Sequence, residues 1–270
     1  VFVTLGYLLA PLVACFFIGD IVTAKLFFVV WLFLGLALIF FVILFFISYK
    51  NKKTAIGLVE DAPRKQITFL KEIHLWKRIG NFILPILFLT FFLNIMDAFY
   101  WTIGPLLSER LGMDGERGLF MTTFLLPPLI VGWFVGKITK RLGKKHTAFF
   151  SLILGSLFLI TFIFIKNPIL LILVNFVASF FLTMSFPAIN GAYADYMSET
   201  PKAEKEIATM VDSFTNLGYI IGPIAAGFSS QYLGYTESFA LLGCFGVVVG
   251  FILIVVTPKK INIKVGNLLR

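Results

Sequence analysis

The sequence predicts an all-α polytopic membrane protein, and three observations lead to that prediction. Hydrophobic residues make up 59% of the 270 residues and charged residues only 14%, with a mean hydropathy of +0.96. Several apolar runs reach the ~20 residues that cross a bilayer core of ~30 Å. Two of these runs carry nearly the same motif, LGYLLAPLVA at 5–14 and LGYIIGPIAAG at 217–227. Such a composition excludes a water-soluble globular domain.

The repeated motif predicts that the chain is built from two related parts. The two copies lie 212 residues apart, and each interrupts an apolar run with glycine and proline. Matched Gly/Pro-interrupted segments are typical of transporters assembled from related halves. We therefore expect a transporter.

Eight spans are expected along the chain, each an apolar run bounded by charged or turn-forming residues. The second is the clearest, because Leu26–Ser48 contains no charged residue. The eight spans cover approximately 1–19, 26–48, 83–107, 117–136, 147–165, 168–189, 209–230 and 236–256.

The loops between these spans divide into two sets, and basic residues are concentrated in one of them. That set, which includes the C-terminal tail, holds 19 of the 23 Lys and Arg residues. The positive-inside rule therefore predicts that these loops and the C-terminus lie on the cytoplasmic side of the cytoplasmic (inner) membrane. This asymmetry also accounts for the formal charge of +9 without a nucleic-acid partner.

The long loop 49–80 is expected to contain a helix of its own. Asp61 can cap this helix, and Pro63 suits its first turn. Apolar residues then recur at helical spacing on one face, and they are Ile67, Leu70, Ile73 and Trp76. Such a helix fits the inner surface of the membrane or the cytoplasmic face of the bundle, and the pattern does not separate the two.

The loop after the fourth span carries a spaced motif of glycines and basic residues, GKITKRLGKK at 136–145. It resembles the loop signature G-x-x-x-D-[RK]-x-G-[RK]-[RK] of the major facilitator superfamily. The matching residues are Gly136, Arg141, Gly143, Lys144 and Lys145, with Lys140 in place of the family's Asp. The resemblance implies a gating role for this loop, although Lys140 removes its acidic partner.

The resemblance extends over nearly the whole chain and implies a major-facilitator-type helical bundle. The segment from Pro187 to Pro223 is similar to helices ten and eleven of that superfamily, and the first two spans to helices five and six. The chain would then be truncated to eight transmembrane helices, the C-terminal two-thirds of a twelve-helix protein. It divides into 1–48, the last two helices of the N-terminal half; 49–80, the cytoplasmic linker; 81–258, the six-helix C-terminal half; and 259–270, the cytoplasmic tail.

One carboxylate lies in the middle of a span. Asp97 is the only charged residue in Ile83–Leu107, and an ionised carboxylate at that depth costs ~2.5–3.5 kcal/mol on insertion scales. Asn94, Tyr100 and Trp101 follow helical spacing on its face. We hypothesise that Asp97 contributes to substrate binding or proton coupling; the alternative is a carboxyl satisfied permanently by a neighbouring helix.

A second group of polar residues lies near the cytoplasmic side or in the later spans. Asp212 begins a stripe that continues with Asn216 and Tyr219, and it fits either a gating role or stabilisation of the helix start. Further polar residues occur in the sixth span, namely Asn175, Thr183 and Asn190. They can line a cavity or form interhelical hydrogen bonds worth ~0.6 kcal/mol each.

Glycine and proline residues of the repeated motif are expected to set helix packing and bending. Gly218 and Gly222 form a G-x-x-x-G pair that allows close helix approach; similar pairs are Gly132 with Gly136 and Gly246 with Gly250. Proline frees the carbonyl one turn earlier and softens a helix, which applies to Pro11 and Pro223. In the superfamily, Gly-x-x-x-Gly-Pro in helix five is associated with exporters, and here Gly6 and Pro11 match while Ala10 replaces the second glycine.

The sequence favours a secondary transporter that moves a small solute by alternating access. Proton-coupled efflux of small organic molecules, similar to drug or sugar efflux, is the first hypothesis; proton-coupled uptake or facilitated diffusion is the second. A membrane-embedded enzyme is the alternative from another class, but the sequence has no clustered His/Asp/Glu motif. No Walker motif, metal-ligand spacing or cofactor motif is present, so we expect no cofactor and no ATP-driven step.

Overall fold

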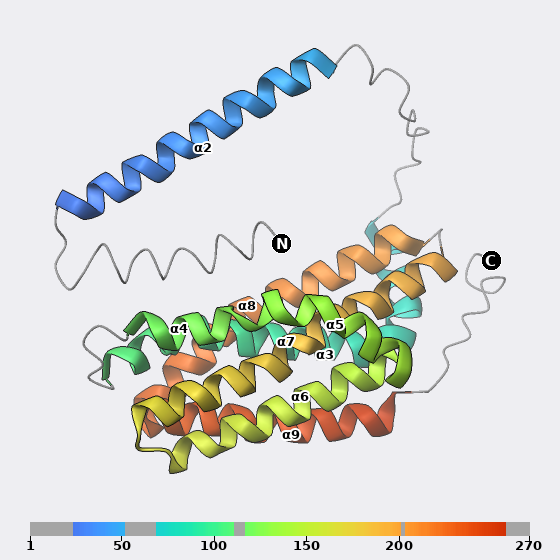
Figure 1. Cartoon of the computed structure of the whole chain (residues 1–270). Coiled ribbons are helices and arrows are strands. Elements are labelled where there is room, and N and C mark those ends of the chain that lie inside the picture. Colours follow the sequence, from blue (N-terminus) through green and yellow to red (C-terminus); the bar gives the residue numbers. More distant parts are fainter. Residues whose placement is uncertain (1–23, 52–68, 111–116, 201–202, 258–270) are drawn as a thin grey trace.

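The computed structural model describes residues 24–51, 69–110, 117–200 and 203–257 (Figure 1). These residues form helices and short turns, with no strand among them, which confirms the all-α prediction. The helices are α2 (Ala24–Asn51), α3 (Phe69–Arg110), α4 (Arg117–Leu125), α5 (Pro127–Leu142), α6 (Lys144–Ile160), the 3₁₀ helix η1 (Thr161–Phe164), α7 (Pro168–Glu199), α8 (Glu204–Leu233) and α9 (Tyr235–Val256).

Five helical segments of the described chain are long and apolar enough to cross a membrane. They are Ile83–Arg110, Leu119–Leu142, Lys144–Phe164, Pro168–Glu199 and Tyr235–Val256. Helix α8 has the length of a span but is not among them, because polar residues such as Asp212 and Asn216 interrupt its apolar run. The expected first span, and Asp61, Pro63 and Ile67 of the linker helix, lie outside the described residues.

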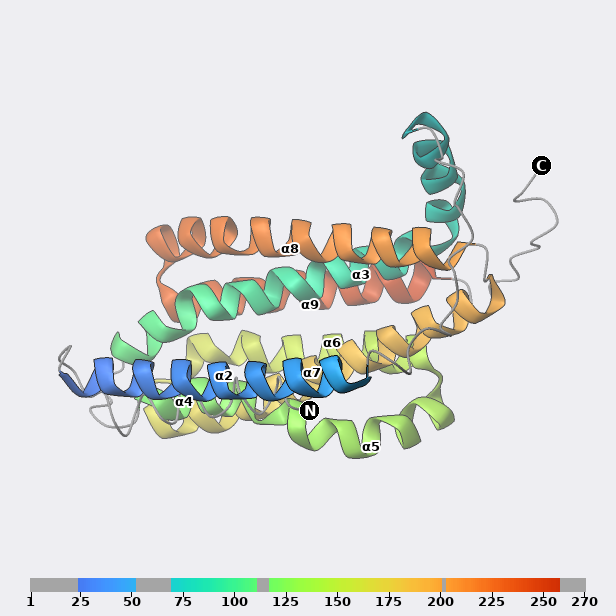
Figure 2. The same cartoon turned by 90° about the horizontal axis from the view of Figure 1, so that it is seen from above.

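The helices α3 to α9 pack into one bundle, from which α2 lies apart (Figure 1). Figure 2 shows α3, α8 and α9 on one side of the bundle and α4 to α7 on the other. Helix α3 packs mainly against α8, whereas α6 packs against both α7 and α9. The core is apolar and aromatic, and Tyr100, Phe120, Phe162 and Phe239 are its largest fully buried side chains.

Glycines permit two very close helix crossings. A Cβ added at Gly218 would lie 2.6 Å from the Phe91 carbonyl oxygen, and one at Gly222 would lie 2.6 Å from the Ala98 Cβ, so α8 touches the backbone of α3. Gly246 and Gly250 of α9 pack closely against the side chains of Ser156 and Ile153 of α6. By contrast, a Cβ at Gly132 or Gly136 would meet no described atom within 4 Å.

Several helix ends differ from the sequence-based expectation. The fourth span is divided at Leu126, because Pro127 and Pro128 cannot donate backbone hydrogen bonds to the preceding turn. Helix α3 continues unbroken through residue 80, although the sequence predicts that the linker 49–80 ends there. Its first turns are directed away from the bundle (Figure 2).

Thr200 has the residue type of an N-cap and precedes Pro201, so the sequence predicts that it caps the next helix. This prediction is wrong. The Thr200 hydroxyl donates instead to the Tyr196 carbonyl at 2.6 Å, so Thr200 ends α7. Helix α8 begins after Ala203, without a side-chain cap, and Glu204 lies in its first turn, where a carboxylate suits the helix dipole.

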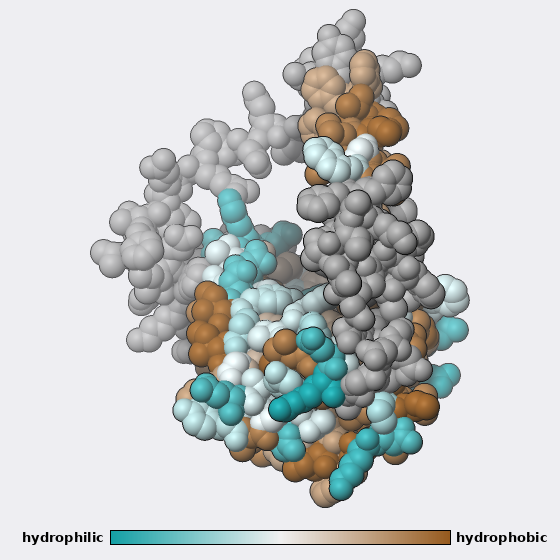
Figure 3. Space-filling view, turned by 90° about the vertical axis from the view of Figure 1, so that its left-hand side faces the viewer, coloured by the Kyte–Doolittle hydropathy of each residue, from teal (hydrophilic) through white to brown (hydrophobic). Residues whose placement is uncertain are grey.

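The ends of the bundle are polar, and its flanks are apolar. Figure 3 views one end, where hydrophilic side chains occupy the end face and hydrophobic side chains the sides. The other end gathers the start of α8 and the ends of α5, α7 and α9 (Figures 1 and 2). The basic residues of the α5–α6 turn therefore lie at the same end as the end of α9. The arrangement matches a bundle whose sides face lipid.

Candidate functional site

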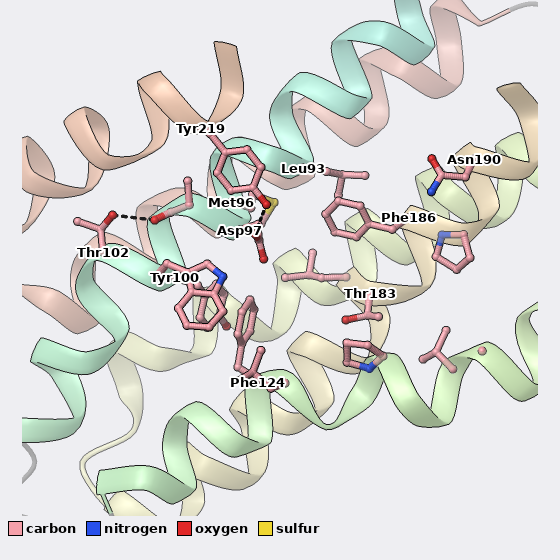
Figure 4. Close-up of a pocket in the computed structure, with 18 of the residues that line it drawn as sticks. Leu93, Met96, Asp97, Tyr100, Thr102, Phe124, Thr183, Phe186, Asn190 and Tyr219 are labelled. Carbon is pink, nitrogen blue, oxygen red and sulfur yellow. Dashed lines mark hydrogen bonds between the residues drawn. The ribbon is translucent and has the colours of Figure 1, made fainter. Parts of the chain in front are cut away.

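A cavity of about 1080 Å³ opens within the bundle (Figure 4). Its walls come from α3, from the broken pair α4 and α5, from α7 and from α8. Most of the wall is apolar or aromatic, and Asp97 is the only charged residue among the described residues that line it. A largely apolar cavity with few polar groups is typical of a small-molecule site.

Asp97 is held by a tyrosine from a different helix. The Tyr219 hydroxyl of α8 donates to Asp97 Oδ2 at 2.6 Å, the contact drawn as a dashed line in Figure 4. The Trp101 side chain, one turn along α3, is a second hydrogen-bond partner of this carboxyl. Because Gly218 and Gly222 flank Tyr219 and bring α8 against α3, helix packing places the hydroxyl within reach of the carboxylate.

An aromatic wall adjoins the carboxylate. The Tyr100 and Phe124 rings stack with their centroids 4.1 Å apart, and the Trp101 ring meets Phe124 edge-on at 6.4 Å. The buried Tyr100 hydroxyl donates to Asn175 Oδ1 at 2.9 Å. Asn175 Nδ2 donates in turn to the Phe120 carbonyl and to Thr123 Oγ1, both at 3.0 Å. Asn175 thus joins α3, α4 and α7 behind the wall.

Some of the expected site residues lie elsewhere. Asn94 is buried and donates to the Thr90 carbonyl at 2.7 Å, outside the cavity. Asn175 is likewise behind the wall and not in it. Asn216 and Asp212 are exposed on α8 and do not line the cavity. The cavity therefore brings together Asp97, Tyr100, Trp101 and Tyr219 from the expected set, with Pro223 beside them.

The loop motif at residues 136–145 lies at the end of the bundle opposite Arg110, the last residue of α3. Its lysines form contacts between α6 and α7. Lys144 Nζ donates to Asp195 Oδ1 at 2.6 Å and to the Gly191 carbonyl at 3.0 Å. Lys145 Nζ lies 5.3 Å from the centre of the Tyr196 ring. Gly143 has φ of +86°, a conformation that glycine adopts without strain. Gly136 and Arg141 are exposed on α5.

The sequence analysis missed part of the cavity wall. Thr183 and Asn190, for which the sequence left a cavity or interhelical hydrogen bonds open, line the cavity, and Phe186 and Pro187 line it with them although the sequence analysis did not identify these two. Phe124 and Pro128 line it from the broken helix, and nothing in the residue type of Phe124 distinguishes it from other apolar positions. The Pro127–Pro128 pair within an apolar run was the available signal, because two prolines must interrupt a helix.

Comparison with known proteins agrees with this architecture. The sequence profile of the Major Facilitator Superfamily matches residues 1–203 and also residues 86–266. The chain is 31% identical over 160 residues to the quinolone resistance protein NorA of Staphylococcus aureus strain MRSA252. It is 30% identical over 159 residues to the same protein of strains Mu50 and N315. These matches cover 58% of this chain and 40% of the relatives' length.

Proposed function

Since the chain belongs to the Major Facilitator Superfamily, we propose that it works in secondary active transport of a small organic solute. The proposed direction is efflux in exchange for protons. The observation that carries the proposal is the cavity among α3, α4, α5, α7 and α8, with one carboxylate that accepts a hydrogen bond from Tyr219 inside a largely apolar wall. Burying a carboxylate at membrane depth costs free energy unless the group is paired or functional. Asp97 is therefore the natural site for a proton or a charged substrate.

Asp97 is proposed as the coupling residue. When its carboxyl is ionised, it accepts the hydrogen bond from Tyr219 at 2.6 Å. Protonation removes the charge and weakens that bond, since bonds to an ionised acceptor are the stronger ones. Proton binding then changes the interaction between α3 and α8, the two helices that the Tyr219 contact joins.

The relatives support efflux over uptake. Their name records resistance to quinolones, and resistance is consistent with export of the compound. The end of the bundle that holds Lys144, Lys145 and the end of α9 is proposed to face the cytoplasm, by the positive-inside rule. Proton-driven uptake and facilitated diffusion remain the alternatives within transport.

Flux in proteoliposomes tests the proposal. A fluorescent quinolone serves as the probe, and a pH gradient is imposed across the vesicle membrane. We expect quinolone movement against its own gradient, with direction set by the pH gradient, and a loss of at least about tenfold in Asp97→Asn. Asp212→Asn is the matched control, because Asp212 is exposed and outside the cavity. Flux that ignores the pH gradient, or full activity in Asp97→Asn, contradicts the proposal.

A further inference from the structure

The break between α4 and α5 has the chemistry of a hinge. Pro127 and Pro128 have no backbone N–H group to donate. The carbonyls four residues earlier, those of Thr123 and Phe124, therefore lack the donors that a continuous helix would supply. Leu126 lies between the two helices and belongs to neither. A bend at this point breaks neither of the two missing bonds, so the proline pair permits α4 to swing as a unit.

Helix α4 is short and forms part of the cavity wall. It lies at the end of the bundle opposite the α5–α6 turn (Figures 1 and 2). Its last two residues, Phe124 and Leu125, line the cavity, and Pro128 continues the wall on α5. The Phe124 ring stacks on Tyr100 of α3. A swing of α4 about the break therefore withdraws Phe124 from Tyr100 and opens this wall of the cavity.

One side chain of α7 holds α4 in place. Asn175 is fully buried, and its Nδ2 donates to the Phe120 carbonyl and to Thr123 Oγ1, both at 3.0 Å. Its Oδ1 accepts from the Tyr100 hydroxyl at 2.9 Å, so the same amide also fixes the ring on which α4 rests. These hydrogen bonds join neutral groups, and each such bond contributes only modestly in net terms. Asn175 is therefore suited to hold α4 reversibly.

We propose that α4 is a lid on the cavity, hinged at residues 126–128 and held shut by Asn175. In the closed position, Asn175 engages α4 and Phe124 stacks on Tyr100. In the open position these contacts are lost together, because they all lie on one short helix. Asn175 is thus a positioning residue that acts on the cavity through Tyr100 and α4. The inference goes beyond the proposed function, since it assigns a moving part and depends on no particular solute or coupling ion.

Distances between paired spin labels test the lid in the full 270-residue chain. Cys15→Ser and Cys244→Ser first remove the native thiols. Labels are then attached to Leu119→Cys in α4 and Phe164→Cys in η1, both at exposed positions. Leu119 lies about 9 Å from the hinge along the helix axis, so a swing of ~20–30° moves its label by about 3–5 Å. We expect a main distance and a minor one that differs by this amount, measured by double electron–electron resonance in nanodiscs without solute or pH gradient.

Two variants should shift the populations in opposite directions. Asn175→Leu removes the hydrogen bonds to α4, so we expect the ratio of open to closed lid to rise at least about fivefold, the effect of one net hydrogen bond. Pro127→Ala/Pro128→Ala supplies the missing N–H donors, and the minor distance should fall by at least about the same factor. Thr123→Val keeps the side-chain shape and removes one of the two bonds. It should move the ratio in the same direction as Asn175→Leu, and it replaces that variant if the latter does not fold.

A label pair that excludes α4 makes the test specific. Phe164→Cys with Tyr232→Cys joins η1 to α8 at exposed positions, and its distance should be the same in every variant. The lid is overturned if the α4 pair gives one distance that no variant alters. It is also overturned if both pairs change together, because the whole bundle then rearranges. Since neither solute nor proton gradient is present, a failure of proton-driven flux overturns the proposed function and leaves this result intact.

Discussion

The close crossing of α8 on α3 predicts that a single methyl group at Gly218 disturbs both stability and transport. In Gly218→Ala the new Cβ would lie 2.6 Å from the Phe91 carbonyl oxygen and 2.8 Å from the Asn94 Cβ. Ordinary contact begins at about 3.4 Å, so α8 must move by ~0.8 Å. The nearest atom belongs to the α3 backbone, which no rotamer change can displace.

The same displacement reaches the site. Tyr219 is the next residue, and its hydroxyl lies 2.6 Å from Asp97 Oδ2. Lengthening this contact by ~0.8 Å takes it beyond the range of a good hydrogen bond. Overpacking of this kind typically costs ~1–3 kcal/mol of stability. We therefore expect a lower midpoint of thermal unfolding in detergent and slower quinolone flux in proteoliposomes.

Gly227→Ala is the matched control, because Gly227 is also in α8 and a Cβ there meets no described atom within 4 Å. It should be neutral or slightly stabilising, as alanine is the better helix former by ~1 kcal/mol. If Gly218→Ala and Gly227→Ala unfold at the same temperature and transport equally well, the close crossing does not hold Tyr219 in place.

Two further predictions concern the wall and the loop. Asn175→Ala leaves the buried Tyr100 hydroxyl without its acceptor, so we expect ~1–3 kcal/mol lower stability. The control Asn216→Ala, at an exposed position, should change stability by less than ~0.5 kcal/mol. Equal midpoints of thermal unfolding for the two variants would refute this prediction. Gly143→Ala should lower the free energy of unfolding by ~1–2 kcal/mol, because Gly143 has a positive φ. Gly136→Ala should leave it unchanged, because a Cβ there meets no described atom within 4 Å. Chemical unfolding of both variants measures the difference.

The fold was predictable because membrane burial imposes a strong and simple pattern. Apolar runs of span length and a charged residue such as Asp97 inside one of them are visible in the sequence alone. Helix ends were less predictable, since Thr200 has the residue type of an N-cap but donates backward to Tyr196. Local propensity did not decide which of two adjacent helices this hydroxyl serves.

The site was predictable only where its residues share a helix with Asp97. Tyr100 and Trp101 follow from helical spacing, but Asn94 has the same spacing and faces Thr90 instead. The partners from other helices depend on how the helices cross, which no periodicity reveals. Phe124 and Pro128 belong to this class, because their place at the cavity follows from the packing of α4 and α5 on α7.

The repeated motif combines packing and chemistry within two helical turns. In the second copy, Gly218 and Gly222 contact α3, while Tyr219 and Pro223 line the cavity. The first copy has Ala10 at the position equivalent to Gly222. At Gly222 itself a Cβ would come within 2.6 Å of Ala98, so a helix with alanine at that position needs a wider crossing. In the second copy, glycine at this position lets α8 approach α3 closely enough to bring Tyr219 against Asp97.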